Sequence, residues 1–251
     1  MSEAKDYGYG LFETIRFQNM KVQNLDKHYI RLKTSAHALD ISFQTSENDF
    51  EMTLLKAIKN SGIDSGLVRY QLDKTGISSQ ESLKVRENRY KKPMYEKGFD
   101  LCLSEVRKSS TALLAGHKTV NYLENLLVMK KARSKGYDEA LYLNEKDYIT
   151  EGAYTNIFFV KGSVLYTPGI ASGLLPGTMR AQVIELARSK KITCLEGAFT
   201  LEDIKNAEAV FVTNALMGIM PVRKINEVKS YNINHIIVRD LSNALMAQWV
   251  Y

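Results

Sequence analysis

The chain of 251 residues contains little cysteine, proline or tryptophan, with two, four and one of these residues respectively. Cys102 and Cys194 lie far apart in apolar, strand-like segments, which favours reduced, buried thiols over a disulfide or a metal pair. The first residues have no apolar signal core, and no apolar run approaches the roughly 18 residues that span a bilayer. These absences argue against a secreted disulfide scaffold and a membrane partner, and they make the cytoplasm the predicted compartment.

Motifs of several common enzyme classes are missing as well. The sequence has no G-x-S-x-G elbow, no Walker loop and no dinucleotide-binding fingerprint. Its four histidines show no spacing with cysteines or carboxylates that is typical of a metal site, and His37 and His235 are interpreted as structural. We therefore expect no metal, and any chemistry must come from other residue types.

The composition is that of an ordinary globular protein, with 45% hydrophobic and 25% charged residues. A formal net charge of +6 leaves two interpretations: binding to an anion, including nucleic acid, or a solvated basic surface. Lysines and arginines are spread along the chain, which favours the second interpretation and predicts no nucleic-acid partner. A non-enzymatic basic binding module is a distant alternative, and it predicts a colourless protein that binds polynucleotides in a salt-dependent way.

Hydrophobic periodicity predicts an α+β fold in which helices and strands intermingle. We expect strands at residues 7–17, 67–72, 100–106, 140–143, 148–150, 157–160, 164–166, 192–195 and 209–213, and helices at residues 25–39, 46–58, 122–135, 176–190, 201–206 and 233–249. The helix at 122–135 has Leu123, Leu126, Leu127 and Ala132 on one face.

The predicted elements fall into two domains. A smaller N-terminal α/β domain covers residues 1–108, residues 109–117 form a linker, and a larger C-terminal domain with a mixed sheet covers residues 118–251. Residues 74–97 are the most polar stretch, and we interpret them as a long exposed loop that is also a candidate specificity element. A ligand pocket is expected near the domain boundary.

Two residues attract attention as candidates for chemistry. Lys118 lies beside the domain boundary, and desolvation of an amine there favours its neutral, nucleophilic form. Glu151 follows a strand in a turn of small residues, where a buried carboxylate requires a cationic partner such as a pyridinium. A lysine that can form a Schiff base and a carboxylate for a ring nitrogen are what pyridoxal 5'-phosphate (PLP) needs from a protein. The simpler alternatives are a surface lysine and a solvated turn residue.

Three further segments could hold a phosphate group. The turn Pro176-Gly177 opens a helix, and backbone N–H groups at a helix N-terminus bind anions. The strand-to-turn segment at residues 213–218 could supply further N–H donors, and Arg31 could add a charge-assisted pair. Taken singly, these features are also explained by an ordinary helix start, a turn and a surface arginine.

Seven segments together resemble the class IV aminotransferases, which are the fold-type IV PLP enzymes. The segments are Gly10-Leu-Phe-Glu-Thr-Ile-Arg16, His28-x-x-Arg-Leu32, Lys118-x-x-Asn121, Gly136-x-Asp-Glu-Ala-Leu141, Thr150-Glu-Gly-x-x-x-Asn-Ile-Phe158, Leu165-Tyr-Thr-Pro168 and Gly177-x-x-Arg180. They occur in the family's order, and the resemblance extends from Tyr7 to about Val222. It implies a two-domain fold of the D-amino acid aminotransferase type, PLP as cofactor, a small-molecule substrate, and a homodimer with the site between the two domains.

The resemblance also implies roles for individual residues. Lys118 is expected to form the Schiff base, and Glu151 to pair with the pyridine nitrogen. The other expected contacts are Arg31, Thr178, Met179, Asn214 and Ala215 for the phosphate, Tyr122 for the phenolic oxygen, and Phe12 and Thr14 for the substrate side. The family usually has a hairpin before its first Gly-x-Phe-Glu strand, whereas six residues precede Tyr7 here, so we expect the N-terminal sheet to lack an edge element.

Within the family, the run Asn214-Ala-Leu-Met-Gly-Ile-Met-Pro-Val222 most resembles the aminodeoxychorismate lyases. This likeness predicts conversion of 4-amino-4-deoxychorismate to 4-aminobenzoate and pyruvate, in folate biosynthesis. The alternative is transamination of branched-chain or D-amino acids, which would use every cofactor residue named for the lyase. The arginine and histidine clamp typical of D-amino acid enzymes is incomplete, because the region of Arg86 and Arg89 has no histidine.

Overall fold

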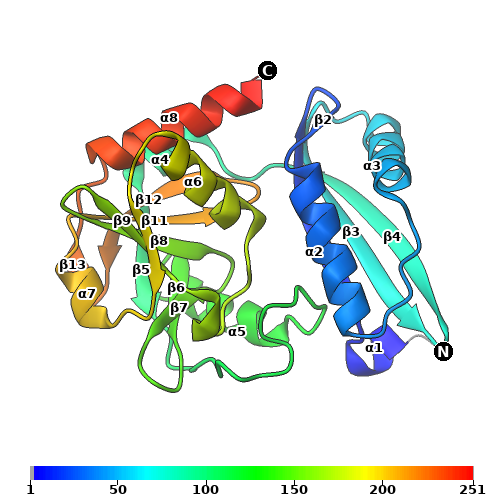
Figure 1. The fold of residues 1–251 in the computed structure, drawn as a ribbon, viewed down its shortest axis with the longest axis horizontal. Coiled ribbons are helices and arrows are strands. Elements are labelled where there is room, and N and C mark those ends of the chain that lie inside the picture. Colours follow the sequence, from blue (N-terminus) through cyan, green and yellow to red (C-terminus); the bar gives the residue numbers. More distant parts are fainter. Residues whose placement is uncertain (1–2, 251) are drawn as a thin grey trace. The chain divides into compact units, whose positions relative to one another are not determined.

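The structure is a computed structural model that describes residues 3–250. Its elements form two compact units, drawn in Figure 1 with colours that follow the sequence. The first unit contains Met1–Tyr90 together with His117–Tyr122, and the second contains Lys91–Gly116 together with Leu123–Tyr251. The chain therefore passes between the units three times.

The first unit is built on a four-stranded antiparallel sheet. Its strands are β1 (Gly10–Gln18), β2 (Lys21–Val22), β3 (Ser65–Thr75) and β4 (Ser78–Glu87), in the order β2-β1-β3-β4. Its helices are α1 (Glu3–Tyr7), α2 (Leu25–Ala38) and α3 (Glu47–Ser61). Alternation along β1 directs Leu11, Ile15 and Phe17 into one buried cluster with apolar residues of α2 and α3, so these two helices cover one face of the sheet.

The second unit contains a mixed sheet of nine strands. The strands are β5 (Phe99–Leu103), β6 (Glu139–Leu143), β7 (Ile149–Gly152), β8 (Asn156–Lys161), β9 (Val164–Pro168), β10 (Cys194–Gly197), β11 (Ala209–Asn214), β12 (Gly218–Ile225) and β13 (Lys229–Ser230). The order is β10-β9-β8-β11-β12-β5-β6-β7, and β13 pairs with β12. The pairs β10/β9, β12/β5 and β5/β6 are parallel, and the others are antiparallel.

Helices cover this second sheet. They are α4 (Lys92–Lys97), α5 (Leu123–Ser134), the short 3-10 helix η1 (Ile170–Ser172), α6 (Thr178–Ser189), α7 (Leu201–Lys205) and α8 (Ile236–Val250). Buried residues of α6 and α8 pack with Phe158, Phe211 and Ile219 of three neighbouring strands, which agrees with the placement of both helices on one side of the sheet in Figure 1. Of the helices in the described residues, none has the length and apolarity needed to cross a membrane.

The prediction of a loop at residues 74–97 is wrong for most of this segment. Strand β4 pairs with β3 over ten residues, and the chain turns between them at Gly76, whose φ of 62° favours glycine. Leu83 and Val85 of β4 pack against the core of the first unit, whereas the charged residues that alternate with them point to solvent. An edge strand with a charged outer face discourages pairing with other chains, and the same polarity makes it look like a loop in sequence.

The two units differ in extent from the predicted domains 1–108 and 118–251. Strand β5, which the sequence placed in the N-terminal domain, pairs in parallel with β12 and with β6 in the second unit. Residues 91–116 consequently belong to the second unit, and residues 117–122 return to the first. Parallel pairing with strands that lie far along the chain has no local sequence signal.

Two further features of the second unit were not predicted from the sequence. Strand β12, which contains Gly218 and Pro221, was not expected, and it pairs with β11 along the centre of the sheet. Three leucines of the predicted helix face on α5 are exposed: Leu123, Leu126 and Leu127 are 67%, 53% and 57% exposed. The buried residues of this helix are Met129 and Ala132.

Candidate functional site

Lys118 is fixed to the first unit through its backbone. Its carbonyl accepts a hydrogen bond from the N–H of Phe12 at 2.9 Å, and Val120 donates to the carbonyl of Gly10 at the same distance. Thr119, between them, forms an isolated antiparallel bridge with Leu11. The segment around Lys118 therefore extends the sheet beside β1, which sets the position of the lysine relative to that strand.

The amine of Lys118 lies close to two aromatic rings. Its Nζ is 4.3 Å from the ring centroid of Phe12 and 5.2 Å from that of Tyr122, and the two rings meet edge to face at 5.2 Å. Both distances lie within the range of a cation–π interaction, which orients the amine. Thr14 is two residues beyond Phe12 and therefore faces the same side of β1, half-buried.

Arg31 lies in a buried ionic cluster that the sequence did not predict. Its Nε donates to Oε1 of Glu13 at 2.8 Å and its Nη2 to Oε2 at 2.5 Å, while Nδ1 of His28 lies 2.6 Å from the same Oε2. Burial alone would raise the pKa of Glu13, but the charges and hydrogen bonds of Arg31 and His28 lower it to about 2. Burial lowers the pKa of His28. Because its pKa is low, Glu13 is ionised at neutral pH and paired with Arg31.

Glu151 is the third of the four residues of β7 and is buried. Its Oε1 accepts a hydrogen bond from Nζ of Lys108 at 2.8 Å. Its Oε2 accepts from the backbone N–H of Leu175 at 3.0 Å and from Nδ2 of Asn156 at 3.4 Å. The carboxylate is therefore held at both oxygens, and Lys108 is its cationic partner.

Glu139 supports the turn that follows Glu151. Its carboxylate accepts hydrogen bonds from the N–H groups of Ala140, Ala153 and Tyr154 at 2.9, 3.1 and 3.1 Å. Burial raises the pKa of Glu139 to about 7, against the lowering effect of these donors. Glu139 thus fixes residues 153 and 154 by hydrogen bonds and changes its protonation near neutral pH.

The N-terminus of α6 has the features of an anion site. Gly177 precedes the helix, has no side chain to cap it, and a Cβ at this position would collide with Oδ1 of Asn156. The first turn contains no acidic residue and begins with Thr178 and Met179, which are both buried. Backbone N–H groups at such a helix start attract negative charge.

Asn214 shapes the turn between β11 and β12. Its Oδ1 accepts hydrogen bonds from the N–H groups of Leu216 and Met217, each at 3.0 Å. Its Nδ2 lies 3.4 Å from the carbonyl oxygen of Tyr154, next to the turn that Glu139 supports. Ala215 is half-buried within this turn.

The structure brings some of the predicted residues together within each unit. In the first unit, Lys118, Tyr122 and Phe12 are in contact, whereas Arg31 pairs with Glu13 on the opposite face of β1. In the second unit, Asn156 links Glu151 to the start of α6, because its Nδ2 also donates to the carbonyl of Leu175 at 2.9 Å.

Sequence reasoning missed Glu13, Glu139 and Lys108 as neighbours of these groups. A signal existed for Glu13, which stands between Leu11 and Ile15 on the apolar face of a strand, where a carboxylate requires a partner. Glu139 has a similar signal, because all five residues of β6 are buried. Lys108 has none, since its pairing depends on contacts with β6 and β7 that the sequence does not reveal.

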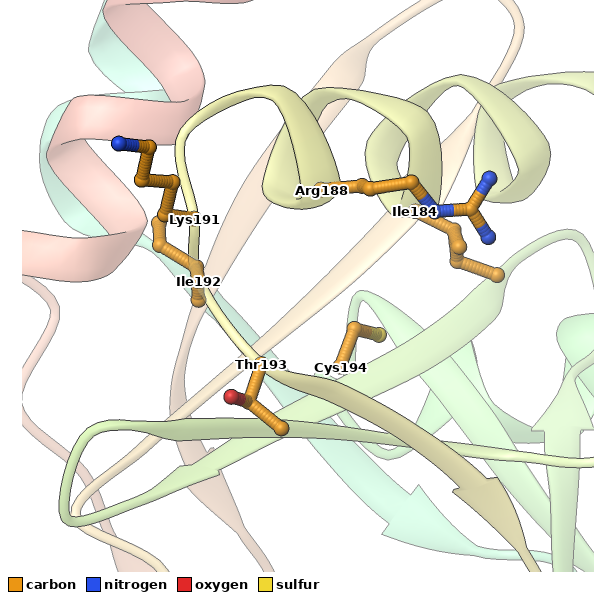
Figure 2. Close-up of a pocket in the computed structure, with 6 residues that line it drawn as sticks. All are labelled: Ile184, Arg188, Lys191, Ile192, Thr193 and Cys194. Atoms are coloured by element: carbon orange, nitrogen blue, oxygen red, sulfur yellow. The ribbon is translucent and has the colours of Figure 1, made fainter.

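A pocket of about 290 Å³ lies elsewhere in the second unit, between α6 and the start of β10. Figure 2 shows its six lining residues, Ile184, Arg188, Lys191, Ile192, Thr193 and Cys194. None of them is a predicted site residue. Burial raises the pKa of the Cys194 thiol to about 11, so this thiol stays protonated and unreactive at neutral pH.

Comparison with known proteins gives consistent matches along most of the chain. The family model described as amino-transferase class IV matches residues 10–225. Aminodeoxychorismate lyase of Bacillus subtilis is 28% identical, over 88% of this chain and 79% of the relative. D-alanine aminotransferase of Listeria monocytogenes is 26% identical, over 89% of this chain and 80% of the relative. The crystal structure of the Escherichia coli branched-chain amino acid aminotransferase aligns with a TM-score of 0.92 at 26% identity, covering 99% of this chain and 88% of the other.

Proposed function

Because this chain belongs to the class IV aminotransferase family, we propose that it is an aminodeoxychorismate lyase. It would convert 4-amino-4-deoxychorismate to 4-aminobenzoate and pyruvate, as a cytoplasmic step of folate biosynthesis. The family depends on PLP, and the chain is a PLP-dependent enzyme of the fold-type IV class. When bound, PLP supplies an electron sink for negative charge that develops beside a substrate amine.

The residues of the second unit fit the cofactor. A carboxylate offers about four acceptor positions, and Glu151 uses three of them, which leaves one for a protonated ring nitrogen. The uncapped start of α6 suits a phosphate. Glu151 would therefore hold the ring nitrogen, and Thr178 and Met179, with backbone at Asn214 and Ala215, would hold the phosphate.

The residues of the first unit fit the covalent and acid–base roles. Lys118 would attach the cofactor and then carry the proton from the substrate ring carbon that bears nitrogen, with Phe12 and Tyr122 orienting its amine. Tyr122 would contact the phenolic oxygen, and Thr14 would face the substrate. Arg31 would contact the phosphate, and Glu13 would orient its guanidinium through two hydrogen bonds.

The observation that carries the lyase proposal is a row of cations on the sheet face that holds Phe12. The strand register places Thr14, Arg69 and Lys84 side by side across β1, β3 and β4. Arg86 lies two residues from Lys84 on the same face, and the guanidinium of Arg69 is 3.7 Å from the ring centroid of Phe12. Aminodeoxychorismate carries two carboxylates, so a cationic face suits it better than it suits an aliphatic side chain.

The deciding experiment incubates the PLP-loaded protein with aminodeoxychorismate in the absence of any keto acid. The two products of the proposed reaction contain all atoms of the substrate, so we expect pyruvate and 4-aminobenzoate in equal amounts. Lys118→Ala should abolish both the reaction and the visible absorption band of the bound cofactor. A protein that releases no pyruvate, but transfers amino groups from branched-chain or D-amino acids to a keto acid, would be a transaminase instead.

We also propose that the enzyme is a homodimer, as the family resemblance implies. The exposed side chains of Leu123, Leu126 and Leu127 form an apolar stripe on α5 that a second copy of the chain could cover. Light scattering on the purified protein should give twice the mass of one chain. Leu126→Glu should shift the protein to the monomer, and a monomeric wild type would contradict the proposal.

A further inference from the structure

Lys108 is anchored where its amine meets Glu151. Its backbone N–H donates to the carbonyl of Leu143 at 3.0 Å, and Lys108 forms an isolated parallel bridge with Asn144. From this position its Nζ reaches Oε1 of Glu151 at 2.8 Å and lies 4.8 Å from the ring centroid of Tyr142. The lysine side chain is mostly buried, so the pair is poorly screened by solvent.

The pair lowers an energetic cost in the protein before the cofactor binds. A buried carboxylate without a cationic partner is costly, and the ring nitrogen that would supply the positive charge is then absent. Lys108 supplies that charge, and the N–H of Leu175 and the amide of Asn156 fix the orientation of the other oxygen. Glu151 is therefore paired with a cation and oriented in the cofactor-free protein.

The same pair has a different effect once the ring is bound. The one acceptor position of Glu151 that remains is enough for a ring N–H, so Lys108 need not leave. Two cations then share one carboxylate, which weakens the bond from each of them.

We propose that Lys108 is a positioning residue for the cofactor ring, which holds Glu151 ready in the empty site and limits how tightly the ring nitrogen is bound afterwards. This rests on the proposed role of Glu151. It predicts a pair of opposite effects that a purely structural lysine would not produce. Removing the charge of Lys108 should destabilise the protein without PLP and, at the same time, tighten the binding of PLP.

The test compares Lys108→Met with the wild type in two measurements, thermal unfolding and PLP titration, neither of which uses a substrate. We expect the variant to unfold at a lower temperature without PLP, and saturating PLP to restore most of the difference. Its dissociation constant for PLP should fall about tenfold. Lys108→Gln, which keeps a hydrogen-bond donor but no charge, should behave alike and serves if the methionine variant folds poorly. Lys108→Arg should resemble the wild type.

A matched control exists in the same unit. Lys161 pairs with Asp203 at 3.3 Å, away from Glu151. Lys161→Met should change the unfolding temperature equally with and without PLP, and it should leave the PLP affinity unchanged. A PLP analogue with carbon in place of the ring nitrogen should bind no more tightly to Lys108→Met than to the wild type. The proposal is overturned if Lys108→Met binds PLP no more tightly than the wild type, or if the tighter binding persists with the analogue. Neither measurement depends on pyruvate release, so a failure of this proposal can be distinguished from a failure of the lyase assignment.

Discussion

Glu13 in the first unit and Glu139 in the second are both buried glutamates, with side chains 1% and 2% exposed, yet their environments differ in one respect. Glu13 is paired with the guanidinium of Arg31, whereas Glu139 accepts hydrogen bonds from neutral donors, three of which are backbone N–H groups. The pKa of Glu13 falls to about 2, and that of Glu139 rises to about 7. A full positive charge outweighs the desolvation of a carboxylate here, and neutral hydrogen-bond donors do not.

The difference gives the two units different uses for a carboxylate. Glu13 is a permanent anion that fixes Arg31, the arginine proposed for the phosphate. Glu139 is near the midpoint of its titration at neutral pH, and it holds the backbone that connects Glu151 to β8. The hydrogen bonds of Glu139 therefore depend on pH in the neutral range, whereas those of Glu13 do not.

The largest expected effect comes from removing the cation of the first pair. Arg31→Met would leave the charge of Glu13 buried with His28 as its remaining partner. We expect the free energy of unfolding of the cofactor-free protein to fall by about 3–5 kcal/mol at pH 7, measured by urea denaturation. Arg31→Lys should lose less, because it keeps the charge. A loss below about 1 kcal/mol for Arg31→Met would mean that the guanidinium does not stabilise Glu13.

The second prediction concerns the neutral pH range. Because the folded pKa of Glu139 lies near 7 and the unfolded value near 4.5, the folded state binds more protons between these values. The stability that this group contributes is present below pH 4.5 and is lost as the pH rises through 7, by roughly 3 kcal/mol in all. Glu139→Gln should remove this decline from urea denaturation curves recorded at pH 5 to 8. An unchanged slope would show that Glu139 titrates elsewhere.

The third prediction is the mirror image at acid pH. The folded pKa of Glu13 is lowered, so its stabilising contribution is present above pH 4.5 and is lost as the pH falls towards 2. Glu13→Gln should be less stable than the wild type at pH 6, and the gap should narrow by up to roughly 3 kcal/mol on acidification. Denaturation curves from pH 6 to 3 measure this gap, and a constant gap would contradict the assignment.

The smallest effect is expected for a lysine–aspartate ion pair that lies outside the environments of Glu13 and Glu139. Lys161 and Asp203 are each about one-third exposed, at 34% and 35%. Lys161→Met should change the free energy of unfolding by less than about 1 kcal/mol, because solvent screens such pairs. Urea denaturation at low and high salt provides the measurement. A larger or salt-independent effect would show that exposure is a poor guide to the strength of ion pairs in this protein.

Local patterns in the sequence predict most helices and strands here, and they fail where the structure depends on distant partners. Strand β4 has the polarity of a loop because it lies at the edge of a sheet, and β12 contains a glycine and a proline although it is central. The sheet to which β5 belongs is decided by strands far along the chain. Residue spacing alone contains no information about such pairings.

The candidate site shows the same division. Lys118, Glu151 and the start of α6 belong to segments with a recognisable order, so the family and cofactor could be predicted, and the comparisons confirm both. The individual roles of the site residues stay predictions. Lys108 could not be found, because its relation to Glu151 arises from the pairing of its backbone with the end of β6.

The short segment His117–Tyr122 has a consequence for how the protein can be made and divided. Only two residues of β1 pair with β2, and the backbone of residues 118–120 covers the other end of that strand's outer edge, at residues 10–12. During synthesis on the ribosome, the first unit is incomplete until this segment has emerged, together with 26 intervening residues (91–116) that belong elsewhere. A fragment truncated at Tyr90 would present an unprotected strand to other molecules and should aggregate, whereas a fragment that continues through Tyr122 carries its own cover.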